Sequence, residues 1–341
     1  MNKKLGKTLK QLLFLSIGVT LVWFSFANSG LTFDEFIEGA QSMNYGYFFI
    51  SALFAMGSHY SRALRWKLLI QSTGHNPKTK NVFASVLFMY ASNIAIPRSG
   101  EVARCGTIYK YEDIPIPTLL GTVFVERAID LLTLLFFTGL LVIIQFDLFS
   151  NLYYNSTLPN VVESFLNNKM NIALAFLLFV MAVAAIYLLR KKIFSFGPMK
   201  KVEQLLIDLK NSLVQVFKMK KKLLFLFHTI LIWLGYVGMF YICFFAFEPT
   251  SHLGLAAGLT AFIAGSFGMV APTSGGAGTW HIMVILALTA LPAVPGFEKI
   301  TEENAAIWAN VAFAIMTFTV IAAGIISFIS LPFMNKNEKV S

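Results

Sequence analysis

Most of the chain consists of long apolar runs separated by short connections that carry the polar and charged residues. A helix crosses the hydrocarbon of a membrane with about 20 residues, so a run of that length predicts a transmembrane helix. The runs that reach this length or nearly so are Leu9–Asn28, Asn44–Leu64, Pro117–Phe146, Asn171–Leu189, Leu223–Phe247 and Ala305–Leu331. The pattern predicts an all-α polytopic membrane protein with about six full spans.

Two further apolar regions are interrupted by proline and glycine. Val82–Ile96 is too short for a span and runs into Pro97-Arg98-Ser99-Gly100. Leu253–Val270 runs into Ala271-Pro272-Thr273-Ser274-Gly275-Gly276-Ala277-Gly278, after which apolar sequence resumes over Trp280–Leu291. Because proline and glycine interrupt helices, each region predicts two shorter helices joined by a turn.

The charges in the connections orient the spans, because Lys and Arg accumulate on the cytoplasmic side of a membrane. Basic residues mark the N-terminus and two connections as cytoplasmic: Lys3, Lys4, Lys7 and Lys10; Arg62, Arg65, Lys67, Lys78 and Lys80; Arg190, Lys191, Lys192, Lys200, Lys201 and the run 218–222. Acids mark external loops: Asp34, Glu35, Glu38, Glu298, Glu302 and Glu303. Residues 147–168 lack Lys and Arg and are also predicted outside, whereas Lys336 and Lys339 return the C-terminus to the cytoplasm.

This orientation requires residues 81–116 to begin and end in the cytoplasm, and residues 252–293 to begin and end outside. The economical interpretation is two re-entrant helical hairpins that enter from opposite faces and whose breaks meet inside the protein. Span, hairpin and span would then recur as residues 44–146 and, inverted, as residues 223–331, a plan found in many transporters. The alternative is two kinked full spans, for which the charge rule would have to fail twice.

We expect a single integral membrane domain over residues 1–341, with a connector at 193–222 between the two repeats. The connector combines an apolar helical stripe with lysines on the opposite face, which predicts a cytoplasmic amphipathic helix on anionic lipid. A plain connector packed on the bundle is the alternative. The first apolar run, residues 12–27, favours a retained signal anchor over a cleaved signal peptide, because further spans follow.

Composition supports the membrane class: of 341 residues, 57% are hydrophobic and 13% charged, and the mean hydropathy is +0.69. The net charge of +10 gathers at the ends of apolar runs, which favours anionic lipid headgroups over nucleic acid as the partner. Cys105 and Cys243 lie far apart in apolar sequence, and the histidines lack metal-ligand spacing. We therefore expect neither a disulfide framework nor a metal or other cofactor.

Charged residues at membrane depth are costly and usually functional. The first interrupted region and the span after it contain Arg98, Glu101, Arg104, Glu126, Arg127 and Asp130. The first three have helical spacing along one side of the helix after the break, and the last three lie roughly 14 to 20 Å into the membrane if counted from Pro117. Two interpretations remain: the arginines bind a lipid phosphate while the acids hold them in position, or the residues form a purely architectural ion-pair network.

The second interrupted region supplies small and polar candidates: Thr273, Ser274, Gly275, Gly276, Gly278 and His281. Glycine allows close approach of the backbone to a ligand, and a helix that begins near Thr279 would direct free N–H groups at the break. This arrangement predicts a cradle for an anion. The alternatives are a tight turn or close helix packing for the glycines, and a hydrogen-bonded packing role for His281.

Three motifs, in this order, resemble the flippase-like transmembrane region of lysylphosphatidylglycerol synthases: Pro97-Arg98-Ser99-Gly100-Glu101-Val102-Ala103-Arg104, Gly121-Thr122-Val123-Phe124-Val125-Glu126-Arg127-Ala128-Ile129-Asp130, and Pro272-Thr273-Ser274-Gly275-Gly276-Ala277-Gly278. The arginine-rich Arg62-Ala63-Leu64-Arg65-Trp66-Lys67 adds to the match, which covers nearly the whole chain. The resemblance implies movement of a phospholipid, or a lipid-linked headgroup, between leaflets. The arginines and the glycine turn would contact the headgroup, and Glu101, Glu126 and Asp130 would keep the arginines in place.

Two features differ from the wider family. Its members often carry a charged residue just after the second glycine cluster, where this chain has Trp280-His281, so a contact there would come from the imidazole. In two-part synthases a cytoplasmic aminoacyltransferase domain follows, whereas this chain ends at Ser341, so we expect a standalone member without that enzyme.

We therefore expect a non-enzymatic lipid translocation protein in a bacterial or archaeal cytoplasmic membrane, with both termini in the cytoplasm. Its expected partners are anionic or phosphate-bearing lipids, with a separately encoded lipid synthase and a second copy of the chain as further possibilities. One alternative is a membrane-embedded transferase that acts on a lipid-linked substrate. Another is a non-transporting scaffold for a separate lipid synthase.

Overall fold

The computed structural model of the protein describes residues 30–146, 216–271, 273–294 and 296–336, with the isolated positions 16, 20, 23, 148, 150 and 214. The predicted span Leu9–Asn28 with its signal anchor, the span Asn171–Leu189 and the connector 193–222 lie largely outside the described residues. The chain divides into two compact units, one of residues 1–141 and 220–341 and one of residues 142–219. The helices discussed below belong to the first unit, apart from the last residues of α6.

Long helices dominate the described part of the chain, in which every regular element is helical. They are α3 (Tyr45–Gln71), α6 (Ile116–Ile144), α11 (Lys222–Phe244) and α14 (Glu302–Met334). Helices α6, α11 and α14 are long and apolar enough to cross a membrane. The predicted all-α membrane class is therefore confirmed, and the ends of these helices agree with the predicted spans to within a few residues.

Helix α3 differs from its prediction at one end only. It begins directly after Asn44, whose side-chain oxygen accepts the Gly46 N–H at 3.0 Å and caps the helix. At its other end it continues past the predicted limit at Leu64 as far as Gln71. Arg62 and Arg65, which we assigned to a cytoplasmic connection, are therefore buried helical residues. Their assignment to a connection was wrong because carboxylates of α6 form ion pairs with these arginines, so the guanidinium groups do not need to be exposed to water.

Each proline- and glycine-interrupted region forms a pair of short helices, as predicted. The first pair is α4 (Thr79–Ala95) and α5 (Gly100–Glu112), and the second is α12 (Leu255–Gly268) and α13 (Thr279–Ala290). The members of each pair pack against each other instead of continuing in one direction. A 3-10 turn, η2 (Ser274–Gly276), lies within the second break.

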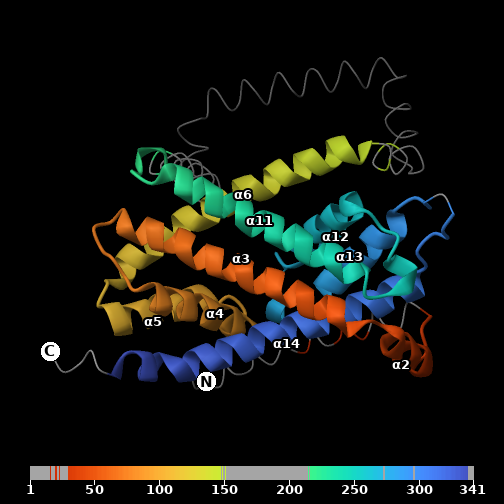
Figure 1. Ribbon diagram of the computed structural model, residues 1–341, viewed down its shortest axis with the longest axis horizontal. Helices are drawn as coiled ribbons and strands as arrows, with labels where there is room; N and C mark the ends of the chain where they lie inside the picture. The colour runs from red at the N-terminus through yellow and green to blue at the C-terminus, as the bar shows by residue number, and fades with distance from the viewer. Residues whose placement is uncertain are drawn as a thin grey trace, which may run out of the picture. The chain divides into compact units, whose positions relative to one another are not determined.

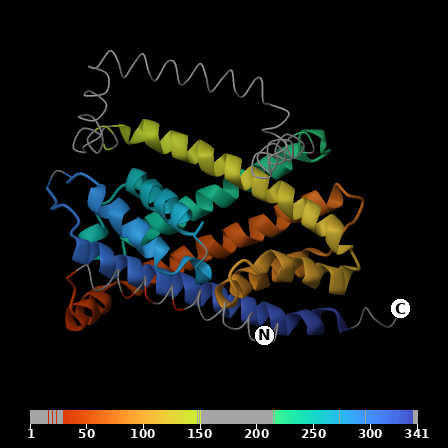
Figure 2. The same ribbon diagram turned by 180° about the vertical axis from the view of Figure 1, so that it is seen from behind.

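The two pairs lie toward opposite ends of α3. Figures 1 and 2 show α4 and α5 near the C-terminal end of α3, and α12 and α13 toward its N-terminal end. Helix α11 packs along α3 and α12, and α14 packs along α4 and α13, so these two helices join the pairs into one core. Trp308 of α14 lies fully buried there, and its Nε1–H donates to the Cys243 carbonyl at 2.9 Å.

Hydrogen bonds and stacked rings hold the connections together at the two ends of this unit. At the C-terminal end of α3, Asn81 and Asn335 exchange side-chain amide bonds of 2.9 Å. At the N-terminal end, the Asn44 N–H donates to the Ala246 carbonyl at 2.8 Å, and His252 stacks on Phe297 with ring centroids 4.3 Å apart. The Lys78 N–H, just before α4, donates to the Glu112 carboxylate at the end of α5 at 3.1 Å, so the first pair begins and ends close together, as the second pair does between His252 and Phe297.

A short helix, α2 (Phe33–Ser42), precedes α3 and packs on α14. The Thr32 hydroxyl accepts the Glu35 N–H, and the Glu35 carboxylate accepts the Thr32 N–H at 2.8 Å, which together form a capping box. The hydrogen bonds from Thr32 lower the pKa of Glu35 below its usual value. The first external loop of the prediction is therefore partly helical.

Candidate functional site

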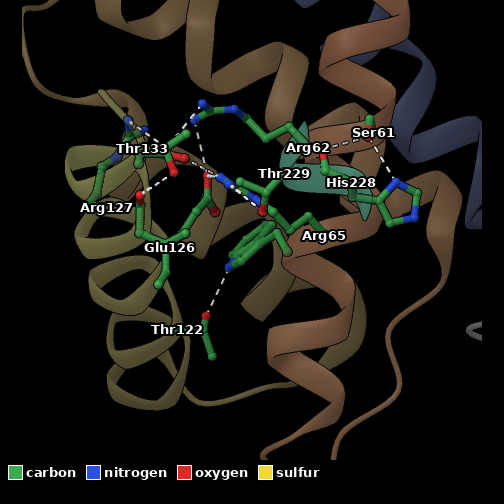
Figure 3. Close-up of polar contacts among 12 residues, drawn as sticks. Ser61, Arg62, Arg65, Thr122, Glu126, Arg127, Thr133, His228 and Thr229 are labelled. Carbon is green, nitrogen blue, oxygen red and sulfur yellow. Dashed lines mark hydrogen bonds and ion pairs between the residues drawn. The ribbon is translucent and has the colours of Figure 1, made fainter. Parts of the chain in front are cut away.

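Glu126 of α6 is fully buried and lies at the centre of a cluster of arginines. One carboxylate oxygen contacts Arg62 Nη1 at 3.1 Å and Arg65 Nη2 at 3.5 Å, and the other contacts Arg104 Nη1 at 2.9 Å. Figure 3 shows Arg62 and Arg65 extending from α3 toward Glu126 on α6. A single carboxylate thus joins α3, α5 and α6.

Asp130, one helical turn after Glu126, binds the same arginines from α3. Its oxygens lie 2.6 Å from Arg65 Nη2 and 3.2 Å from Arg62 Nη2. We call Arg62, Arg65, Arg104, Glu126 and Asp130 the arginine–carboxylate cluster. Charges removed from water are tolerated only when they are closely paired, and each guanidinium of the cluster has a carboxylate within 3.2 Å.

Aromatic rings and hydroxyls complete the surroundings of the cluster. The Arg104 guanidinium lies over the Trp66 ring at 4.4 Å, and the Trp66 Nε1–H donates to the Thr122 hydroxyl at 2.9 Å. Arg65 donates to the Thr229 hydroxyl of α11 at 3.4 Å. The cluster is therefore enclosed by α3, α5, α6 and α11. Its Arg104 side chain is fully buried.

A second ion pair lies nearer the surface. Arg127 Nη2 contacts Glu101 Oε1 at 2.8 Å, and 42% of the Arg127 side chain is exposed. Its other terminal nitrogen is 3.9 Å from Asp130, so this pair continues from the arginine–carboxylate cluster. The pair joins α5, which follows the first break, to α6.

The two breaks contact each other. The Arg98 guanidinium, in the first break, donates to the Val270 carbonyl of the second break at 3.4 Å. A Cβ added to Gly275 would lie 3.1 Å from Ile94 Cγ1 at the end of α4, and η2 packs on α4. The predicted meeting of the two breaks is thus present in the structure.

A cavity of about 580 Å³ lies between the two helix pairs and the long helices. Its charged lining residues are Arg62, Arg98, Glu101, Arg127 and Asp130. Much of the remaining wall is apolar or aromatic, including Phe48, Leu131, Leu134, Trp233, Met239, Phe240, Phe262, Phe313, Met316 and Val320. A cavity with this combination suits an amphiphile that carries an anionic group.

The structure separates the predicted site residues into two groups. Those that line the cavity are Arg98, Glu101, Arg127, Asp130, Thr273, Gly275 and Gly276. Those that do not line it are Arg104, Glu126, Ser274, Gly278 and His281. Arg104 and Glu126 are committed to each other in the buried cluster, so their placement fits the architectural interpretation rather than direct headgroup contact.

His281 has the placement of a packing residue. It is buried, its Nδ1 accepts the Gly278 N–H at 3.3 Å, and its ring packs against Phe313 with centroids 4.5 Å apart. This hydrogen bond stabilises the end of the second break, where Gly278 has a φ of 83°, a conformation that residues with a side chain rarely adopt. Helix α13 begins at Thr279, as predicted.

Several lining residues were missed as site residues. Arg62 was interpreted as a topological signal and as part of a family motif but not as a site residue, although its spacing of three from Arg65 indicates a shared helix face. His59, Tyr90 and Tyr236 also line the cavity, and no pattern in the sequence distinguishes these three from other polar groups of apolar helices.

Comparison with known proteins gives a family match over most of the chain. The family model described as the lysylphosphatidylglycerol synthase TM region matches residues 11–324. A curated relative, the UPF0104 membrane protein MJ1595 of Methanocaldococcus jannaschii, is 30% identical over 135 residues, which cover 39% of this chain and 40% of that protein. The matched part is thus well under half of that relative's length. No solved structure matches the chain.

Proposed function

Because the chain belongs to the lysylphosphatidylglycerol synthase transmembrane family, we propose that it moves a phospholipid or a lipid-linked headgroup between the two leaflets of a membrane. The observation that carries the proposal is the cavity where the two interrupted helix pairs meet. Arginines occupy part of its wall and apolar side chains much of the remainder. A headgroup needs a polar path through the hydrocarbon, and the charged and polar side chains of the cavity wall would line one.

The two helix pairs would enter the membrane from opposite faces as re-entrant hairpins. The distribution of charge at the two ends of the unit supports this. The end that contains the C-terminus of α3 carries basic residues: Lys67, Lys78, Lys80, Lys110, Lys221, Lys222 and Lys336. The opposite end carries acids: Asp34, Glu35, Glu38, Glu248, Glu298, Glu302 and Glu303. The charges of opposite sign are fewer: Glu112 and Asp113 at the first end and Lys299 at the second. By the positive-inside rule the first end faces the cytoplasm, and residues 44–146 and 223–331 then form two inverted repeats.

Arg98 is the leading candidate for contact with the phosphate. It lines the cavity, lies on an exposed turn, and has no carboxylate partner within the described part of the chain. Its φ of 63° is unusual for a residue with a side chain, and such strained backbone is concentrated at functional sites. Arg127 and Arg62, which also line the cavity, would assist, since arginine presents a planar fork that matches phosphate oxygens.

The carboxylates would position the arginines. Glu101 holds Arg127 at 2.8 Å, and Asp130 holds Arg62 at 3.2 Å. Since each of these acids is already ion-paired, neither is a free base for a group transfer, and we propose no covalent step for this chain. Movement of the headgroup would instead follow from rearrangement of the contacts between the two breaks.

Reconstitution tests the proposal. In vesicles that contain a fluorescent phospholipid, an external quencher reaches only the outer leaflet. Purified protein in these vesicles should therefore speed the loss of fluorescence from lipid that starts in the inner leaflet. Arg98→Gln, which removes the charge but leaves the fold, should reduce the rate at least tenfold, while the exposed Lys299→Gln should leave it unchanged. The proposal fails if the wild-type protein moves none of a panel of anionic and zwitterionic lipids, or if Arg98→Gln moves them at the wild-type rate.

A further inference from the structure

Helix α2 has an acidic side and an apolar side. Residues three and four apart share a side of a helix, so one side carries the exposed acids Asp34, Glu35 and Glu38. The other side carries apolar residues: Phe33, Phe36, Ile37 and Ala40. The helix contains no Lys or Arg. A helix divided in this way is typical of an interface, where one side meets water and the other meets protein or lipid.

Protein covers part of the apolar side only. Gly39, at one edge of that side, packs against the Ile307 side chain of α14, which a Cβ added to Gly39 would approach to 2.8 Å. At the other edge, 68% of Phe33 and 37% of Ile37 are exposed. These two residues are one turn apart, so their side chains are neighbours, and we call them the α2 strip. One exposed apolar residue is ordinary on a protein, whereas two adjacent ones on the apolar side of an amphipathic helix favour a partner.

The place of α2 in the unit is that of a membrane–water interface. Figure 1 shows α2 at the end of the unit, beside the beginning of α3. It packs on the first turns of α14, a helix long and apolar enough to cross a membrane. The Tyr45 hydroxyl, from the first residue of α3, donates to the Ala40 carbonyl of α2 at 2.9 Å. Tyr45 and Tyr47 are exposed, and exposed tyrosines gather where a membrane meets water.

Contacts at both ends of α2 fix its rotation about its own axis. Leu31, just before the helix, and Met43, just after it, are both buried. The capping box of Thr32 and Glu35 fixes the first turn. With its ends and one edge held by protein, α2 cannot turn the α2 strip toward the core. The cover for the strip then comes from what surrounds the unit at this depth, which is the lipid around α14.

We propose that α2 lies along a membrane surface, at the end of the unit that carries the acids, with the α2 strip in the lipid and the acidic side toward water. Interfacial helices often carry basic residues that attract anionic headgroups. Because α2 has none, its contact with the membrane is apolar rather than electrostatic. The helix would hold the beginnings of α3 and α14 at the level of the headgroups. This inference goes beyond the proposed function, since it requires no movement of lipid.

Spin labels on the two sides of α2 test the inference. With the native cysteines replaced by alanine, Phe33→Cys and Ile37→Cys place a nitroxide on the α2 strip, and Asp34→Cys and Glu38→Cys place it one residue further, on the acidic side. In phosphatidylcholine nanodiscs, oxygen concentrates in the lipid, whereas a nickel chelate stays in water. We expect the ratio of oxygen collisions to nickel collisions to be at least about threefold higher at each strip position than at the residue after it.

Three results would overturn the inference: similar ratios on the two sides, a higher ratio on the acidic side, or strip labels that neither reagent reaches, which would show that protein covers the α2 strip. All four labelled positions are exposed, so the variants should unfold in detergent at the wild-type temperature. If Phe33→Cys does not, Ile37→Cys with Glu38→Cys gives the comparison alone. The vesicle assay for lipid movement is independent: protein that moves no lipid but shows the expected ratios would refute translocation and leave the placement of α2 intact.

Discussion

At the scale of single residues, the two carboxylates of the cluster form ion pairs with three arginines. Glu126 alone contacts Arg62, Arg65 and Arg104. A buried ion pair adds little stability compared with an apolar pair of the same shape, but removing one partner leaves the other charge buried and alone. The cluster therefore fixes how α3, α5 and α6 are placed, and it does so at the wall of the cavity.

Neutralising Glu126 should destabilise the protein strongly. Glu126→Gln keeps the size of the side chain but leaves Arg62 and Arg65 with Asp130 alone, and leaves the buried Arg104 without a carboxylate among the described residues. We expect a loss of about 3–5 kcal/mol in the free energy of unfolding. Chemical denaturation in detergent measures this loss, with the exposed Glu298→Gln as the control. A change below about 1 kcal/mol, as is typical for a surface pair, would contradict the account of the cluster.

The sequence indicated most of these residues but not which of them line the cavity and which lie in the buried cluster. Arg98, Arg104 and Glu126 were visible in the sequence as intramembrane charges, and Arg104 and Glu126 are paired at 2.9 Å. The predicted placement of Arg98 on the same helix face as Arg104 was wrong, because α5 begins at Gly100 and Arg98 lies in the turn before it. Which of them faces the cavity depends on the side of α5 and α6 that packs inward, and the charge pattern does not determine that side. Arg62 was misassigned because the sequence does not show whether an arginine near the end of an apolar run is exposed to water or forms a buried ion pair with a carboxylate.

At the scale of elements, glycine allows the close approach of helices at several contacts, one of which lies between α4 and α14. A Cβ added to Gly324 of α14 would clash with the Ala91 side chain and would lie 2.9 Å from the Leu87 carbonyl oxygen of α4. Helices that meet over such small residues approach closely enough for backbone contact. This contact holds the first helix pair against α14.

Adding a single methyl group tests that contact. Gly324→Ala should lower the free energy of unfolding by about 1–3 kcal/mol, because α4 and α14 must separate. Gly121→Ala, at an exposed position of α6 where an added Cβ meets nothing within 4 Å, should be neutral or stabilising by up to about 1 kcal/mol. The two melting temperatures in the same detergent give the comparison. Equal effects at both positions would show that the α4–α14 contact is looser than described.

The elements themselves were largely predictable. Pro97 and the glycines after Thr273 interrupt helices for reasons of backbone geometry, so both breaks could be read from composition. The spacing of Thr32 and Glu35 matches a capping box, a pattern that marks the start of α2. What the sequence could not supply was the extension of α3 beyond Leu64, which depends on partners far along the chain.

At the scale of the whole molecule, the proposed inverted repeats make a prediction about sidedness. Cysteines at Asn76 and Asp113 flank the first helix pair, and cysteines at Glu248 and Lys299 flank the second. If both pairs are re-entrant, the first two should react with an impermeant thiol reagent only from the cytoplasmic side, and the last two only from outside. The native cysteines are buried and provide a low background. Labelling of Asn76 and Asp113 from opposite sides would mean that the first pair crosses the membrane.

The central claim is that headgroups pass where the two breaks meet, and a reversible cross-link between them tests it most directly. A Cβ on Gly275 would lie 3.9 Å from the Ile94 Cβ, within the range that a disulfide bridges. In a background with Cys105 and Cys243 replaced by alanine, Ile94→Cys with Gly275→Cys should form the disulfide on oxidation. Oxidation should stop lipid movement in vesicles, and reduction should restore it, whereas the rate of each single-cysteine variant should be the same before and after oxidation. A cross-link that does not form, or one that forms and leaves the rate of lipid movement unchanged, would contradict the account.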